Sequence, residues 1–121
     1  MNNKGISEDY VFLWGTGEAY REFLYVDDLA EACILLMEHY NYKEIGEFIN
    51  IGTGTDVKLK TLAEIIKEIV GFSGGMKYDT SKPDGMERKL LDVSRIKALG
   101  WEAKTNLESG LRNIYKWYIS G

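Results

Sequence analysis

Two segments of the sequence combine residue types that bind anionic ligands. In the first, residues 14–23, Trp14 and Arg21 stand on either side of a glycine turn. The second, residues 81–89, contains three cations and an acid that bear on ligand binding: Lys82, Arg88, Lys89 and Asp84. Arginine binds phosphate oxygens bidentately, lysine adds a point charge and tryptophan offers a flat apolar face. If the two segments meet, they can hold a diphosphate beside a base or sugar ring; the alternative is a pair of solvated loops.

Two Gly-x-Gly motifs, at residues 15–17 and 52–54, are predicted to be turns. A dinucleotide-binding loop has a third glycine and opens directly into a helix whose N-terminus holds the pyrophosphate. The motif at 52–54 lacks that glycine and its helix starts several residues later, whereas the motif at 15–17 is followed by an extended run. No cofactor-binding residue is therefore assigned to this chain.

The sequence offers no convincing catalytic group. Tyr78 and Lys82 have the Tyr-x-x-x-Lys spacing of short-chain dehydrogenases, but Pro83 disfavours the helical geometry that such a pair needs. His39 is expected at the end of a helix, where a cation is favoured by the helix dipole. The adjacent residues Asp27 and Asp28 point to different faces, so a helix cap is the better interpretation.

Composition bounds the class of protein. The chain has 121 residues, a net charge of −4, one cysteine and one histidine. We expect a single domain over residues 1–121 and no nucleic-acid partner, because phosphate binding normally needs a basic excess. A disulfide framework or a zinc site needs more cysteine and histidine. The sequence shows neither a signal peptide nor a membrane-spanning stretch, so we expect a cytoplasmic protein.

Strands and helices are expected to alternate, which predicts the α/β class. Short apolar runs rich in β-formers predict strands over residues 11–14, 22–26, 47–51 and 76–79. Helical spacing of apolar residues predicts about four helices. The first runs from Asp27 or Asp28 to about Tyr40, with Cys33 buried on its apolar face.

The other three helices follow from their end signals. One begins at Asp56 or Thr61 and stops at Gly71. A short helix is capped by Asp92 and ends at Gly100. Thr105 and Glu108 are predicted to form the capping box of the last helix. The strands are few and short, which indicates part of a larger sheet.

Several segments, taken in order, resemble one enzyme family. They are Trp-Gly-Thr-Gly (14–17), Arg-Glu-Phe-Leu-Tyr-Val-Asp-Asp-Leu-Ala (21–30), Ile-Asn-Ile-Gly-Thr-Gly (49–54), Lys-Pro-Asp-Gly (82–85), Arg-Lys-Leu-Leu-Asp-Val-Ser (88–94) and Leu-Gly-Trp (99–101). From about Val11 onward the chain resembles the C-terminal part of the GDP-L-fucose synthases, NADP-dependent epimerase–reductases of the extended short-chain dehydrogenase family. The resemblance implies a partial, substrate-binding region without a complete Rossmann domain.

The resemblance also implies roles for individual residues. Trp14, Arg21 and Lys89 match positions where the family contacts its GDP-sugar, and Asp84 and Arg88 are expected to support or extend that surface. The family's NADP loop and catalytic groups lie upstream of the matching region, so none is expected here and the chain alone should be inactive. The implied partners are a GDP-sugar and either a separate Rossmann domain or another copy of the chain in a homo-oligomer.

Three positions depart from the family's pattern. Met86 and Glu87 stand where a proline is common, and Glu18-Ala19-Tyr20 replaces a small or proline-containing spacer. Lys58 occupies the position of the Ser or Thr that opens a helix. We expect the fold to tolerate all three. The alternative functions are a non-catalytic nucleotide-sugar-binding module and a fragment of another nucleotide-sugar epimerase or dehydratase.

Overall fold

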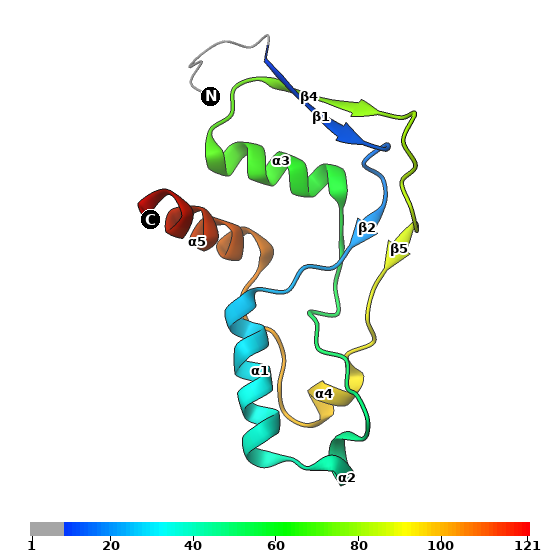
Figure 1. Cartoon of the computed structure of the whole chain (residues 1–121), viewed down its shortest axis with the longest axis vertical. Helices are drawn as coiled ribbons and strands as arrows, with labels where there is room; N and C mark the ends of the chain where they lie inside the picture. The colour runs from blue at the N-terminus through cyan, green and yellow to red at the C-terminus, as the bar shows by residue number, and fades with distance from the viewer. Residues whose placement is uncertain (1–8) are drawn as a thin grey trace. The chain divides into compact units, whose positions relative to one another are not determined.

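The computed structural model describes residues 9–121, and this range contains five short strands and five helices (Figure 1). The strands are β1 (Tyr10–Trp14), β2 (Tyr20–Arg21), β3 (Val57–Lys58), β4 (Gly75–Asp79) and β5 (Arg88–Lys89). The helices are α1 (Val26–His39), α2 (Tyr42–Ile45), α3 (Leu59–Val70), α4 (Ser94–Ala98) and α5 (Leu107–Ser120). The α/β class predicted from the sequence is confirmed.

The described chain divides into two compact units. Unit 1 contains residues 9–21, 57–89 and 111–121, and all five strands belong to it. Unit 2 contains residues 22–56 and 90–110, with α1, α2 and α4. Among residues 9–121, no helix is long and apolar enough to cross a membrane.

Unit 1 is built on two small sheets. β1 and β4 pair in parallel, from Tyr10 opposite Gly75 to Trp14 opposite Asp79. In the second sheet the order is β3-β2-β5, with β2 antiparallel to β3 and parallel to β5. The strands predicted over 11–14 and 76–79 are confirmed as β1 and β4. An apolar groove of about 480 Å³ is lined by side chains of α3, β1 and β4.

Helix α3 ends as predicted but starts by a different device. Gly71 has a φ of +75°, the left-handed conformation that glycine adopts without steric cost, and it terminates the helix. Neither Asp56 nor Thr61 caps the start. Instead, the first amides donate to carbonyls of the 17–19 segment: Leu59 N to Ala19 O and Lys60 N to Gly17 O, both at 2.9 Å.

Unit 2 has a hydrophobic core formed by helices and loops. Its buried members are Ala32, Leu36, Val93, Ile96 and Trp101. The prediction that Cys33 is buried is wrong, because its side chain is exposed on α1. Met37, one turn further along, is 77% exposed. The core therefore selects the Ala32–Leu36 side of the apolar stripe and leaves the Cys33–Met37 side in solvent.

Asp28 stabilises a different segment from the one predicted. Helix α1 begins after Tyr25 without a side-chain cap, so neither Asp27 nor Asp28 is its N-cap. The buried Asp28 carboxylate instead accepts hydrogen bonds from Lys104 N at 3.2 Å and from Thr105 N and Oγ1 at 2.9 and 3.2 Å. Asp28 thus anchors the residues that lead into α5.

The predicted start of α5 is shifted by one residue. Asn106 Oδ1 accepts a hydrogen bond from Ser109 N at 2.8 Å, which is the capping contact at the first turn. Thr105 cannot serve as the cap because its amide and hydroxyl are engaged by Asp28. The capping box of Thr105 and Glu108 is therefore wrong. Asp92 is not the N-cap of α4, which begins after Val93 without a side-chain cap, although Asp92 Oδ1 accepts from Ser94 N at 2.9 Å.

The strands predicted over 22–26 and 47–51 are wrong. Residues 22–25 are outside any strand and Val26 already belongs to α1. In the 47–51 segment, Arg95 donates to Phe48 O at 2.9 Å and Asn50 Nδ2 donates to Asp92 O at 3.3 Å. Side-chain hydrogen bonds from Arg95 and Asn50, rather than pairing with another strand, hold this segment.

Candidate functional site

The candidate site begins at the turn that follows β1. Gly15 and Gly17 have φ angles of +87° and +80°, so this turn needs glycine at both positions. Gly15 N donates to Asp79 O at 2.9 Å, one residue beyond the last rung of the parallel pair. The turn presents Thr16 at its tip, between the two glycines.

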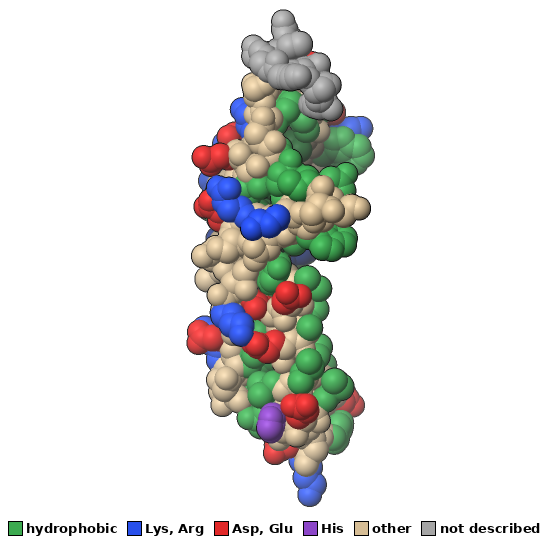
Figure 2. All heavy atoms as spheres, turned by 90° about the vertical axis from the view of Figure 1, so that its left-hand side faces the viewer, with side chains coloured by type: hydrophobic (Ala, Val, Ile, Leu, Met, Phe, Trp, Pro, Cys, Tyr) green, Lys and Arg blue, Asp and Glu red, His purple; other side chains and the backbone are tan. Residues whose placement is uncertain are grey.

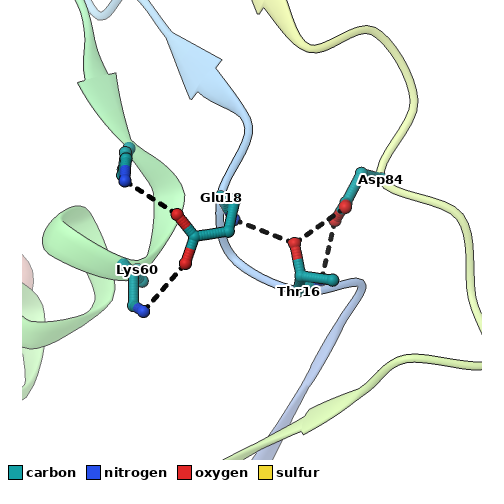
Figure 3. Close-up of polar contacts among 5 residues, drawn as sticks. Thr16, Glu18, Lys60 and Asp84 are labelled. Carbon is teal, nitrogen blue, oxygen red and sulfur yellow. Dashed lines mark hydrogen bonds and ion pairs between the residues drawn. The ribbon is translucent and has the colours of Figure 1, made fainter.

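Asp84 binds this turn from the loop that follows β4. Its carboxylate accepts from Thr16 N at 2.7 Å and from Thr16 Oγ1 at 2.8 Å (Figure 3). The backbone and hydroxyl hydrogen bonds from Thr16 hold the pKa of Asp84 below its ordinary value. A Cβ at position 15 would overlap Asp84 Oδ1, so Gly15 also makes room for this carboxylate.

Arg21 holds the same loop from β2. Its Nη1 donates to Tyr20 O at 2.6 Å and to Met86 O at 2.8 Å, and Nη2 lies 3.4 Å from Asp84 O. Gly85 lies between these two loop carbonyls and has a φ of +79°. The 84–86 loop is therefore attached to Thr16 by a side chain and to Arg21 by its backbone.

Trp14 and Lys82 form a cation–π pair on the solvent side of this arrangement. The Lys82 ammonium lies 4.9 Å from the centroid of the indole ring. Trp14 nevertheless remains 72% exposed. An exposed indole beside an ammonium group can contact a ligand that carries both a planar ring and negative charge.

The two predicted cations of β5 lie beside β2. In the parallel pairing, Lys89 is opposite Arg21 and Arg88 is opposite Tyr20. The Arg88 guanidinium lies 4.1 Å from the Tyr20 ring centroid. Arg88 and Lys89 are both exposed, so β2 and β5 together present cationic groups to solvent.

A second polar cluster, missed by the sequence interpretation, joins the turn to α3. Glu18 accepts from Lys58 Nζ at 2.7 Å and from Lys60 Nζ at 2.9 Å, while Glu18 N donates to Thr16 Oγ1 at 3.1 Å (Figure 3). Hydrogen bonds and charges from Lys58 and then Lys60 lower the pKa of Glu18 to about 2. Glu18 and Lys58 both depart from the family's sequence pattern. Two such departures in one chain were the signal that could have predicted this ion pair.

The five sequence-predicted site residues all belong to unit 1. Asp84 and Arg21 meet at the 84–86 loop, and Lys89 joins them through strand register. Trp14 contacts Lys82, which lies two residues before this loop. The sequence interpretation grouped Lys82 with the cations but did not select it as a site residue. Thr16 was also overlooked, because a threonine inside a glycine turn carries no charge signal.

The second glycine motif belongs to unit 2 and holds a carboxylate of the chain itself. Glu22 Oε2 accepts from Gly54 N at 2.7 Å, and Glu22 Oε1 accepts from Leu91 N at 3.1 Å. A Cβ at Gly52 would lie 2.5 Å from Glu22 Oε2, so this glycine allows the close approach. With Glu22 in place, the residues present do not fit a cofactor phosphate at this loop.

The known proteins that are similar to this chain have related names. Residues 2–52 match the NAD dependent epimerase/dehydratase family. The chain is 49% identical to GDP-L-fucose synthase 1 of Arabidopsis thaliana over 109 residues, which are 90% of this chain and 33% of that protein. It is 45% identical to GDP-L-fucose synthase of Escherichia coli (strain K12), covering 90% of this chain and 36% of that protein.

A solved structure shares both the fold and the sequence. It is the GDP-mannoheptose C4 reductase of Campylobacter jejuni with NADP bound, with a TM-score of 0.82 and 43% identity over 97% of this chain and 37% of that one. The chain thus spans about a third of the length of the relatives it matches. The motifs at 14–17, 21–30 and 82–94, together with these matches, show that the chain is similar to the C-terminal part of the GDP-L-fucose synthases.

Proposed function

We propose that this chain is the GDP-sugar-binding part of an NADP-dependent GDP-L-fucose synthase, which epimerises and reduces GDP-4-keto-6-deoxy-mannose to GDP-L-fucose. The observation that carries the proposal is the cluster in unit 1, where an exposed indole adjoins the loop that Arg21 holds. In this proposal Trp14, Arg21 and Lys89 contact the ligand. Asp84 and Arg88 support or extend the surface.

The chemistry of the cluster suits a nucleoside diphosphate. The exposed cations of β5 supply charge for the diphosphate oxygens, and the Trp14 ring supplies an apolar face for a base or sugar. Arg21 contacts three carbonyls, whereas a guanidinium has five N–H donors. It can therefore hold the loop and still offer a donor to a ligand.

We propose that the chain does not catalyse the reaction alone. Hydride transfer needs a bound nicotinamide and an acid beside the ketone. The 52–54 loop holds Glu22, and the 15–17 turn holds Asp84, so neither is available to a cofactor phosphate. In the proposed enzyme, NADP is bound by a Rossmann domain outside these 121 residues, and residues 1–121 act as one substrate-binding domain in the cytoplasm. Turnover of substrate by this chain with NADPH alone would contradict this division of labour.

The proposed partner of the chain is that Rossmann domain, with a second copy of the chain as the alternative. Exposed apolar residues of β1 support an association of either kind: Tyr10, Val11 and Phe12 are all solvent-accessible. The relatives are about three times as long as the matched region, which favours the Rossmann domain.

Two other functions compete with this proposal. One is a non-catalytic nucleotide-sugar-binding module, and the other is part of a different nucleotide-sugar epimerase or dehydratase. Both share the cationic loop and the exposed indole. A different epimerase would differ in base selectivity, which ligand titration measures, whereas a non-catalytic module would differ in needing no Rossmann domain.

Amide NMR of the chain, titrated with GDP-mannose and then UDP-glucose, tests the proposal. We expect saturable shifts at Trp14, Arg21 and Lys89 with the guanosine ligand. Lys89→Met should weaken binding, whereas Lys97→Met, a matched change on α4, should not. Shifts with UDP-glucose alone would favour a different epimerase. A dispersed spectrum that responds to neither ligand would contradict autonomous binding by this chain.

A further inference from the structure

Two contacts link the 14–17 turn to the 82–86 loop. On each segment the two contacting residues are two positions apart. Lys82 lies over Trp14, and Asp84, two residues further along, binds Thr16, which is also two residues further along. Both contacts lie at the carboxyl end of the parallel pair of β1 and β4, whose last rung is Trp14 opposite Asp79. A shift of either segment at the second contact would therefore change the first.

Thr16 is the centre of this link. Its amide and hydroxyl both donate to Asp84, and its hydroxyl oxygen accepts from Glu18 N (Figure 3). A valine would keep the branched shape and the backbone N–H but would lose both hydroxyl contacts. A serine would keep them. Position 16 therefore offers a pair of variants that differ in the hydrogen bonds under test.

We propose that Thr16 is a positioning residue for the ligand surface, acting through Asp84 to hold Lys82 over the face of Trp14. Asp84 acts here as an internal acceptor, because both of its oxygens face Thr16. Arg21 secures the other side of the loop at the carbonyls of Asp84 and Met86. The inference rests on the proposed function for the identity of the ligand, and on geometry alone for the placement of Lys82.

The first measurement needs no ligand. Side-chain protons of Lys82 lie over the Trp14 indole, so the ring current should shift their NMR signals upfield. We expect Thr16→Val and Asp84→Ala to remove most of this shift and Thr16→Ser to retain it. Asp92→Asn serves as the control, because Asp92 is another exposed acid that accepts a backbone N–H, in unit 2. An unchanged Lys82 shift in both Thr16→Val and Asp84→Ala would overturn the proposal.

The second measurement is a double-mutant cycle on the GDP-mannose dissociation constant. If Thr16 acts through Asp84, each single variant should weaken binding about tenfold, the effect of about 1.4 kcal/mol, and the double variant should weaken it no further. Additive losses would mean that Asp84 contacts the ligand itself, which would overturn the positioning role. If the unsubstituted chain binds no GDP-mannose, the proposed function fails for this chain, and the ring-current shift alone decides the role of Thr16. Should Thr16→Val fail to fold, Asp84→Ala and Thr16→Ser carry the same comparison.

Discussion

At the scale of single residues, two carboxylates bind distant backbone segments, a role that the sequence did not predict. Asp84 fills the glycine turn after β1, and Asp28 anchors the residues before α5. Both accept backbone N–H groups from segments far away in the sequence. Asp28 is buried, so its removal would leave its donors without partners and would affect the structure of unit 2.

Gly15→Ala should destabilise unit 1 more than Gly71→Ala. Both glycines have a positive φ, so an alanine at either position incurs about 1–2 kcal/mol of backbone strain. At Gly15 the new Cβ also overlaps Asp84 Oδ1, whereas nothing lies within 4 Å of a Cβ at Gly71. Urea unfolding of both variants measures the difference. Equal losses would contradict the close approach of Asp84, and Gly15→Ala combined with Asp84→Ala should recover part of the loss.

Asp28→Ala should destabilise unit 2 by roughly 1–3 kcal/mol for each donor left unsatisfied. Asp28 is 2% exposed and accepts from Thr105 N and Lys104 N. Asp27→Ala is the matched control, since Asp27 is exposed and occupies the same first turn of α1. Thermal unfolding compares the two, and a similar loss in both would mean that the helix dipole, rather than the anchor, explains the effect.

At the scale of elements, the start of α3 is held by residues 17–19, which follow the distant strand β1. Carbonyls of Gly17 and Ala19 accept its first amides, and Glu18 neutralises Lys58 and Lys60 there. Two lysines at the positive end of a helix are unfavourable on their own. The Glu18 carboxylate supplies the negative charge that the first turn of α3 lacks.

The stability contributed by Glu18 should depend on pH in a defined window. Its pKa in the folded chain is about 2, below its ordinary value of 4.5, so its stabilising effect is complete above about pH 4.5 and is lost as the pH falls towards 2. Thermal unfolding at low salt should therefore show a shallower pH dependence over this range for Glu18→Gln than for the unsubstituted chain. Parallel curves would show that the contacts with Lys58 and Lys60 contribute nothing, and high salt should reduce the difference.

The sequence predicted elements whose signals are local. The apolar runs of β1 and β4, the C-terminal stop of α3 at Gly71 and most of α1 are confirmed by the structure. The failures share a physical cause, because a distant segment decided each of them. Asp28 meets Thr105, carbonyls 17 and 19 cap α3, and the core chooses Ala32 over Cys33.

The residues of the candidate site also divide into those with a local sequence signal and those defined by a distant contact. The charged and aromatic members could be selected by residue type, and the resemblance to the GDP-L-fucose synthases narrowed the choice to Trp14, Arg21 and Lys89. The linking residues could not be selected in this way. Thr16 and Lys82 are important because two segments, 68 residues apart at the Thr16–Asp84 contact, meet at the end of a parallel strand pair.

At the scale of the whole molecule, the two units differ in how well their apolar residues are covered. Unit 2 has a buried core that includes Ile96, at 0% exposure. In unit 1, none of the residues of α3 is fully buried, and an apolar groove runs between this helix and the β1–β4 sheet. Hydrophobic side chains also reach the surface on the face drawn in Figure 2. Exposed apolar area of this kind favours association.

Ile96→Ala should lower the free energy of unfolding of unit 2 by about 2–5 kcal/mol, the usual effect of a large-to-small change in a core. Ile34→Ala on α1 removes the same atoms from a side chain that is 51% exposed, and it should cost much less. Hydrogen exchange followed by NMR reports each unit separately. A comparable loss of protection from both substitutions would contradict the core assigned to unit 2.

The purified chain should self-associate as its concentration rises, because β1 exposes several large apolar residues. Light scattering over a concentration series measures the mass, and Phe12→Lys should shift it towards the monomer. Tyr42→Lys, an equally exposed aromatic in unit 2, is the control. A monomeric mass at high concentration would count against association.

The exposed thiol of Cys33 has a practical consequence. The chain contains one cysteine, and it lies on α1 in unit 2, away in sequence from the residues assigned to the ligand. A maleimide fluorophore would therefore attach at a single position without any substitution. Since none of the candidate ligand residues is altered, the labelled chain can be used directly in anisotropy titrations, and the same thiol requires a reductant during storage to prevent covalent dimers.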